Sequence, residues 1–237
     1  MKKIRILTIV FEPEIKGNEV QLFRGAVIAK AGRDCILFHN HKDDKVYNYR
    51  YPLIQYKRIR RHATIVCIEK GVDEIHRLFS APDWKVRIGR EEKELKILKL
   101  DVKQYTMNVW DKMFNYRIFN WLALNEENYK RYMQIESLSE RIEFLEKILT
   151  ANILSFAKGV GWTVPEDKEI KVKIMEIQKK KIVKFRRAYL TAFDVDFQTN
   201  VFLPENISLG KAASHGFGMV RKLINDRQKQ IKHRQVK

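Results

Sequence analysis

Residues 2–31, KKIRILTIVFEPEIKGNEVQLFRGAVIAKA, predict a strand followed by a helix. The apolar run over residues 2–11 is typical of a strand, and the polar EPEIKGNE segment after it predicts a turn. Apolar residues between Val20 and Ala31 then recur with the 3.6-residue period of a helix, and Gly32 is well suited to end it. A strand that leads directly into a helix is the beginning of a split βαβ unit.

The next segments continue this pattern as far as residue 103. The apolar and alternating runs predict three more strands, DCILFHNH (34–41), VYNYRYPLIQYKRI (46–59) and RRHATIVCIE (60–69). GVDEIHRLFSA predicts a short helix, and residues 84–102 predict one or two further strands. The order β-α-β-β-(β)-α-β is that of a ferredoxin-like unit, in which helices cover one face of the sheet.

A second unit with a similar order begins at residue 104. Ser137 and Glu140 form a capping-box pattern that opens a long helix, which Gly159 is expected to end. Aromatic and alternating runs before and after this helix predict strands, and the segment from residue 219 is expected to begin as a helix. The sequence therefore predicts an α+β fold of two tandem ferredoxin-like (RRM-like) domains with antiparallel sheets, residues 1–103 and 104–237.

The composition favours a folded protein with a polyanionic partner. Hydrophobic residues make up 45% of the 237 residues, which is enough for a buried core. The 47 Lys and Arg against 29 Asp and Glu give a formal net charge of +18, which favours nucleic acid first and an anionic membrane surface second. The two cysteines, Cys35 and Cys67, lie in apolar runs and predict buried thiols in a reducing compartment. Since no run approaches the length of a membrane span, we expect a cytoplasmic protein without membrane partners.

His39 and His41 are the first candidates for chemistry. In a strand they would point to the same face, with about 7 Å between them along the strand. Three interpretations are open: two ordinary histidines at a polar strand end, half of a metal site, or a general acid–base pair. A zinc site needs further ligands, and Asp43 and Asp44 do not offer a matching spacing.

Two histidines would be sufficient to cleave RNA by acid–base catalysis. One imidazole can remove the proton of the ribose 2′-OH and the other can protonate the departing 5′-oxygen, without a metal. Tyr47, Tyr49 and Tyr51 follow at alternate positions and share one strand face, where they could support this chemistry or simply pack on the sheet.

Two basic segments are candidates for contacts with the RNA backbone. YKRIRRH (residues 56–62) carries four cations in five positions, and it is either a solvated edge strand or a phosphate-binding strip. Residues 171–187 form a second basic strip. The RNA-binding residues expected from these segments and from the tyrosine segment are Tyr47, Arg50, Lys57, Arg58, Arg60, Arg61, Lys184, Arg186 and Arg187.

The segment GKAASHGFGMVRK (210–222) adds a glycine-rich loop surrounded by cations. Glycines allow close approach of the backbone to a phosphate, although a tight turn explains them equally well. The loop lacks the Gly-Lys-Ser/Thr of a Walker loop and the third glycine of a Rossmann fingerprint. The expected RNA-binding residues here are Lys211, Ser214, His215, Gly216, Gly218, Arg221 and Lys222.

Together these segments resemble the CRISPR-associated endoribonucleases of the Cas-six family, and within it the b subtype. The resemblance spans most of the chain and rests on FHNH, YRYPLIQYK (49–57) and SLGKAASHGFGMVRK (208–222). It implies two ferredoxin-like domains of the RAMP type and metal-independent cleavage of precursor CRISPR RNA within the repeat. The implied products end in a 2′,3′-cyclic phosphate or a 3′-phosphate.

The resemblance also implies roles and partners. His39 and His41 correspond to the catalytic histidines of the family, and Tyr49 is the first choice for its catalytic tyrosine, with Tyr47 the second. The expected partner is CRISPR repeat RNA, with CRISPR effector subunits and a second copy of the chain as further candidates, and no cofactor or metal is expected. The alternative function is that of a non-catalytic RAMP-type subunit that holds RNA in an effector complex. The paired imidazoles favour the enzyme, because binding alone does not need them.

Overall fold

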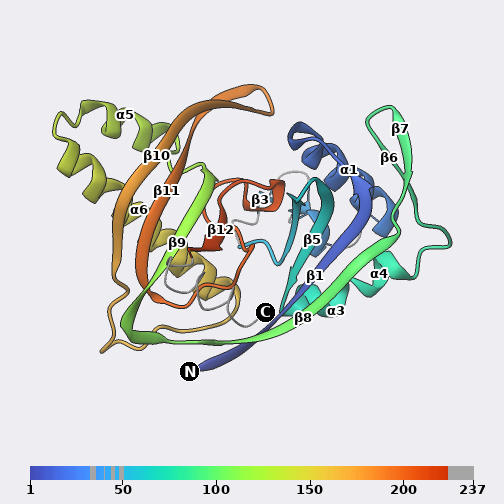
Figure 1. The fold of residues 1–237 in the computed structure, drawn as a ribbon, viewed down its shortest axis with the longest axis horizontal. Coiled ribbons are helices and arrows are strands. Elements are labelled where there is room, and N and C mark those ends of the chain that lie inside the picture. The colour runs from blue at the N-terminus through green and yellow to red at the C-terminus, as the bar shows by residue number, and fades with distance from the viewer. Residues whose placement is uncertain (33–35, 40, 44–45, 48–50, 224–237) are drawn as a thin grey trace, which may run out of the picture.

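The computed structural model describes residues 1–32, 36–39, 41–43, 46–47 and 51–223 of the chain. Two four-stranded antiparallel sheets lie beside each other, each with helices on one side (Figure 1). The chain passes from the first sheet to the second at Asn108, between strands β8 and β9. The division expected after residue 103 lies within β8, which pairs with β1 as far as Met107.

The first domain has a four-stranded sheet in the order β4-β5-β1-β8. This order, with β1 between its neighbours in a split βαβ arrangement, is that of a ferredoxin-like fold. Its elements in chain order are β1 (Lys2–Glu14), η1 (Gly17–Glu19), α1 (Val20–Ala31), α2 (Ile36–His39), β2 (His41–Asp43), β3 (Val46–Tyr47), β4 (Ile54–Ile59), β5 (His62–Ile68), α3 (Lys70–Glu74), α4 (His76–Phe79), β6 (Lys85–Ile88), β7 (Glu91–Glu94) and β8 (Ile97–Met107).

The second domain repeats the same sheet order as β10-β11-β9-β12. Its long helix buries Leu145, Leu149, Ile153 and Phe156, which share the face predicted from their spacing. A loop over residues 202–218 stands where the second helix of a ferredoxin-like unit would lie. The elements are β9 (Val109–Trp121), α5 (Glu126–Gln134), α6 (Leu138–Gly159), β10 (Val172–Phe185), β11 (Ala188–Val201), η2 (Ala213–His215) and β12 (Met219–Lys222).

The two faces of the first sheet have different neighbours. On one face, Phe23 of α1 packs edge to face against Phe11 and Tyr56, with ring centroids 6.1 and 5.8 Å apart. On the other face, Ile4 and Val66 belong to a core that also contains side chains of the second domain. The domains therefore share a core, and Figure 1 shows the second sheet facing the side of the first sheet that α1 leaves free.

The predictions of two ferredoxin-like domains and of a long helix that begins after Ser137 are confirmed. The Ser137 hydroxyl accepts a hydrogen bond from the Glu140 N–H at 3.5 Å, which is the cap expected from the sequence. None of the helices in the described ranges is long and apolar enough to cross a membrane.

Two local predictions are wrong. Residues 36–39 form a helical turn rather than part of a strand, and it is fixed by Phe38, whose side chain is buried and whose carbonyl accepts from the Tyr56 hydroxyl at 3.3 Å. Residues 219–222 form β12 instead of a helix, because they pair with β9 and bury Val220.

Candidate nucleic-acid interface

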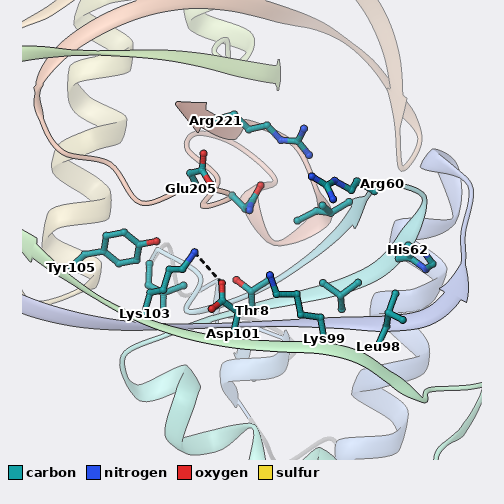
Figure 2. Close-up of a pocket in the computed structure, with 14 residues that line it drawn as sticks. Thr8, Arg60, His62, Leu98, Lys99, Asp101, Lys103, Tyr105, Glu205 and Arg221 are labelled. Carbon is teal, nitrogen blue, oxygen red and sulfur yellow. Dashed lines mark ion pairs between the residues drawn. The ribbon is translucent and has the colours of Figure 1, made fainter. Parts of the chain in front are cut away.

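A groove with a volume of about 670 Å³ lies between the first sheet and the second domain. Its floor is formed by the outward side chains of β1 and β8, and its walls by the β4–β5 turn and by β12 (Figure 2). The residues that line it are Ile6, Thr8, Val10, Ile59, Arg60, His62, Leu98, Lys99, Asp101, Lys103, Tyr105, Glu205, Asn206 and Arg221.

Cations outnumber acids in this groove. Arg60 enters from the β4–β5 turn and Arg221 from β12, and their side chains extend toward each other (Figure 2). Lys99 and Lys103 stand on β8, with Asp101 between them. Asp101 binds Lys103 at 3.0 Å, and this hydrogen bond and charge raise the pKa of Lys103. The groove therefore offers several fixed positive charges to an anionic ligand.

A neighbouring ion pair leaves the Arg221 charge available to the groove. Arg221 lies opposite Arg117 in the β12–β9 ladder. The Arg117 guanidinium binds Asp196 through two hydrogen bonds of 2.5 and 2.6 Å, and this hydrogen bonding is the main reason that the pKa of Arg117 is raised. Arg221 itself lies over the ring of Phe119 at 5.9 Å.

The groove combines two predicted residues with three that the sequence analysis missed. Arg60 and Arg221 were expected to bind RNA, whereas His62, Lys99 and Lys103 were not singled out. The alternation along ILKLDVKQY (residues 97–105) could have indicated that Lys99 and Lys103 lie together, since every second side chain of a strand lies on one face.

Lys57 does not belong to the surface of the predicted phosphate-binding strip, because it is buried. Its side chain is only 1% exposed, and its ammonium donates a hydrogen bond to the Ser208 hydroxyl. Burial lowers the pKa of Lys57 to about 7, because the charged form is poorly solvated there. A residue buried in this way holds the two domains together and is not a surface contact for RNA.

The other residues of the YPLIQYK segment serve the same domain contact. The Tyr51 hydroxyl donates to the Ser208 carbonyl at 2.8 Å and accepts from the Gln55 amide at 2.9 Å. The Ser208 N–H in turn donates to the side-chain amide oxygen Oε1 of Gln55 at 2.9 Å. The Tyr51 ring packs on Phe156 of α6, with centroids 5.1 Å apart. This segment therefore fixes the residue that comes just before the glycine-rich loop.

The remaining cations of the predicted strip lie at the surface. Arg58 is exposed and its Nε donates to the Ile15 carbonyl at 2.7 Å, while Arg61 pairs with Glu14 at 2.9 Å. Both contacts bring the β4–β5 hairpin close to the end of β1. Of the two arginines in the turn, Arg60 lines the groove, while Arg61 is paired with Glu14.

The glycine-rich loop lies between the domains. Gly216 and Gly218 have φ values of +86° and +67°, a region that favours glycine. A Cβ on Gly216 would come within 3.1 Å of Val20, and one on Gly218 within 1.9 Å of the Leu209 carbonyl oxygen. The glycines are therefore needed for close packing. Ser214 is half-buried in this loop, while Lys211 and Lys222 are exposed beside it.

The tip of the β10–β11 hairpin lies against this loop. Phe185 contacts the rings of His215 and Phe217, with centroids 5.2 and 5.5 Å apart. The three predicted cations of the tip are exposed next to these contacts: Lys184, Arg186 and Arg187. The tip and the glycine-rich loop thus form a second basic surface, contributed by the second domain alone.

The structure changes the expected relation between the two candidate histidines. His39 is the last residue of α2, and His41 is the first residue of β2, so they do not share a strand. The β2–β3 ladder places His41 opposite Tyr47. Tyr49 and Arg50 lie outside the described residues. The proximity of His41 to Tyr47 is therefore a feature of the backbone, and the catalytic roles of these residues stay predictions.

No group of three or more metal-ligating side chains (His, Cys, Asp or Glu) occurs within the described part of the chain.

Comparisons with known proteins give the class and then the family. Two ferredoxin-like domains that pack together, with a glycine-rich loop between them, form a RAMP-type fold. The model of the Cas6b N-terminal domain matches residues 2–106, and that of the Cas6b C-terminal domain matches residues 108–223. The chain belongs to the Cas6b family, which confirms the resemblance seen in the sequence.

Individual relatives agree with this assignment. A solved Cas6b structure has a TM-score of 0.84 and 27% identity, and the match covers 94% of this chain and 100% of that one. A second, described as the CRISPR RNA processing endoribonuclease Cas6b, has a TM-score of 0.71 and 26% identity over the same shares. The uncharacterized protein MJ0978 of Methanocaldococcus jannaschii is 34% identical over 120 residues, which are 50% of this chain and 79% of that protein.

Proposed function

We propose that this chain is an endoribonuclease that matures CRISPR RNA by cutting its precursor within the repeats. The observation that carries the proposal is the match of both domains to Cas6b over residues 2–106 and 108–223. One solved relative of similar length is described as a CRISPR RNA processing endoribonuclease. The net charge of +18 and the cation-lined groove agree with a polyanionic substrate.

The RNA would contact both basic surfaces. Arg60, Arg221, Lys99 and Lys103 provide phosphate contacts in the groove, and the hairpin tip provides further contacts beside the glycine-rich loop. Phosphate contacts fix the position of the strand without reading its sequence, so their role is to bring one phosphodiester to the reacting groups.

The chemistry would be an attack of the substrate on itself. One of His39 and His41 removes the 2′-OH proton, the 2′-oxygen bonds to the adjacent phosphorus, and the bond from phosphorus to the 5′-oxygen breaks. The other histidine gives its proton to that 5′-oxygen. Tyr49, or Tyr47, donates a hydrogen bond to the charged phosphorane. The product is a 2′,3′-cyclic phosphate, and the reaction needs neither a metal nor a cofactor.

The test uses end-labelled repeat RNA and the full chain in the presence of EDTA. We expect cleavage at one position, and we expect a single 2′-deoxy substitution at that position to abolish it while binding persists. Loss of cleavage in EDTA that Zn²⁺ or Mg²⁺ restores would contradict the proposed chemistry. Tight binding of the repeat without any cleavage would instead support a non-catalytic subunit of an effector complex.

A further inference from the structure

Two carboxylates line the groove among its cations, and they differ in their partners. Asp101 is paired with Lys103 at 3.0 Å. Glu205 is exposed and, within the described part of the chain, its side chain forms neither an ion pair nor a hydrogen bond. A negative charge without a cation of its own repels phosphates and opposes binding of an RNA backbone. Its place in the groove therefore indicates a contact with another part of a nucleotide.

The chain on both sides of Glu205 is held in place. Before it, the Leu203 N–H donates to the hydroxyl of the buried Tyr116 at 2.8 Å. After it, the Asn206 N–H donates to the Val220 carbonyl of β12 at 2.8 Å. Asn206 has a φ of +66°, a conformation that asparagine adopts more readily than most residues, and its side chain also lines the groove. The turn is therefore ordered before a ligand binds, which lowers the cost of binding.

Tyr105 offers an aromatic surface at the same end of the groove. Its half-buried ring lies at 27° to the ring of Phe202, with centroids 6.1 Å apart. Burial raises the pKa of Tyr105 most, and the charge of the nearby Glu205 adds to the rise. Figure 2 shows Tyr105 and Glu205 at the end of the groove that holds Lys103. An aromatic ring beside a carboxylate suits a base rather than a phosphate.

We propose that Tyr105, Glu205 and Asn206 form a subsite for one unpaired guanine of the RNA in the groove, an inference that rests on the proposed function and names the base selected there. The Tyr105 ring would stack on the base, and the Glu205 carboxylate would accept hydrogen bonds from its Watson–Crick edge. The cations of the groove would hold the adjacent phosphates.

A carboxylate distinguishes the four bases by their donors. Guanine presents N1–H and the N2 amino group side by side, and these match the two oxygens of a carboxylate. Adenine and cytosine present an amino group beside a ring nitrogen that is an acceptor, and uracil presents one N–H between two carbonyl groups. The acceptors of these three bases would face Glu205 and repel it. The Asn206 amide can donate, which suits the O6 of guanine.

Binding of short oligonucleotides to the full chain tests the selection of the base. The probes are fluorescein-labelled single strands of about eight uridines with one guanine, inosine or adenine at the centre, and fluorescence anisotropy gives their affinities. We expect the guanine probe to bind at least about fivefold more tightly than the adenine probe. Inosine keeps N1–H and O6 but lacks the amino group, so its probe should fall between the two.

Glu205→Gln should remove the preference for guanine, because a carboxamide presents one acceptor where a carboxylate presents two. Glu166→Gln is the matched control, since Glu166 is an exposed glutamate in a turn of the second domain that does not line the groove. Both variants add the same positive charge and should bind every probe somewhat more tightly. Only Glu205→Gln should change the ratio of the guanine and adenine affinities.

Tyr105 variants test the stacking separately. Tyr105→Leu should weaken the binding of all three probes at least about fivefold, while Tyr105→Phe should keep the wild-type affinity, because it keeps the ring. Unchanged circular dichroism would show that each variant is folded. Equal affinities of the wild type for the guanine and adenine probes, a guanine preference that survives Glu205→Gln, or wild-type binding by Tyr105→Leu would each overturn the proposal.

These measurements do not depend on cleavage. A chain that prefers guanine through Glu205 but cuts no repeat RNA would support the subsite and contradict the proposed nuclease function alone. A chain that cuts repeat RNA and binds the guanine and adenine probes equally would overturn the subsite alone.

Discussion

At the scale of single residues, Lys57 shows how burial changes a side chain that looks like a surface cation in the sequence. Lysine at this position has the Ser208 hydroxyl as its partner and almost no solvent, so its charged form is disfavoured. Its pKa, lowered from 10.5 to about 7, links domain stability to pH.

The first prediction follows from that pKa. Between pH 7 and 10.5 the unfolded chain keeps a proton on Lys57 that the folded chain has released, so the free energy of unfolding should rise with pH across this window. The contribution of one proton is at most about 1.4 kcal/mol per pH unit. Urea denaturation at a series of pH values measures it.

Lys57→Met should remove this rise, because methionine does not titrate. Lys147→Met changes an exposed lysine of α6 and should leave the dependence as it is in the wild type. If the Lys57→Met chain shows the same slope as the wild type, the ammonium of Lys57 is not desolvated in the way the structure indicates.

The second prediction concerns His39 and His41. If they share the base and acid roles, each alanine variant should lose a factor on the order of 10²–10⁴ in the single-turnover cleavage rate. The double variant should be barely slower than the poorer single one, because groups that act as a unit are not additive. RNA affinity should change little, since neutral imidazoles provide few phosphate contacts.

His76→Ala is the control for this experiment, because His76 is exposed on α4. Wild-type cleavage rates for both His39→Ala and His41→Ala would mean that the two histidines are ordinary polar residues. The general base and acid would then have to lie elsewhere, and His215 in the glycine-rich loop would be the next candidate to replace by alanine.

At the scale of elements, the loop between β11 and β12 takes the place of a helix and connects the domains. Ser208 in its middle is held by Tyr51 and Gln55, and Gly216 near its end packs on Val20 and on the backbone of Tyr56. Because the loop contacts the first domain at both Ser208 and Gly216, its conformation depends on the packing of the two domains.

The third prediction is that Gly218→Ala destabilises this loop. The substitution forces a Cβ to within 1.9 Å of the Leu209 carbonyl oxygen, at a φ of +67° that alanine disfavours. The expected loss is at least about 1–3 kcal/mol in the free energy of unfolding, with weaker RNA binding. Gly25→Ala in α1 meets no atom within 4 Å and should be neutral or slightly stabilising. Equal unfolding midpoints for the two variants would contradict the packing described for the loop.

At the scale of the whole molecule, the arrangement of the domains brings distant cations together. Arg60 and Lys99 belong to the first domain and Arg221 to the second, yet all three line one groove (Figure 2). The groove therefore depends on the shared core and on the contacts of Ser208, as well as on the charged residues themselves.

The fourth prediction uses the salt dependence of RNA binding. Replacing Arg60, Lys99 or Arg221 by alanine should lower affinity and reduce the log–log slope against salt by roughly 0.7 for each lost contact to single-stranded RNA. Arg77→Ala on α4 removes an arginine on the helix side of the first domain, where it pairs with Glu74, and should leave the slope unchanged. The groove is not the path of the RNA if its variants behave as Arg77→Ala does.

The sequence alone determined the two ferredoxin-like domains, the capped helix after Ser137, and the excess of positive charge. Each depends on local periodicity, on a local cap or on composition, which do not require knowledge of distant contacts. Tertiary structure decided the helical turn at residues 36–39, the pairing of β12 and the burial of Lys57. It also decided which residues line the groove. These depend on which segments meet in space, because a residue's exposure and strand partners are set by neighbours far along the chain. Lys57 and Arg60 lie three positions apart, and only packing against Ser208 separates a buried contact between domains from a cation that can reach RNA.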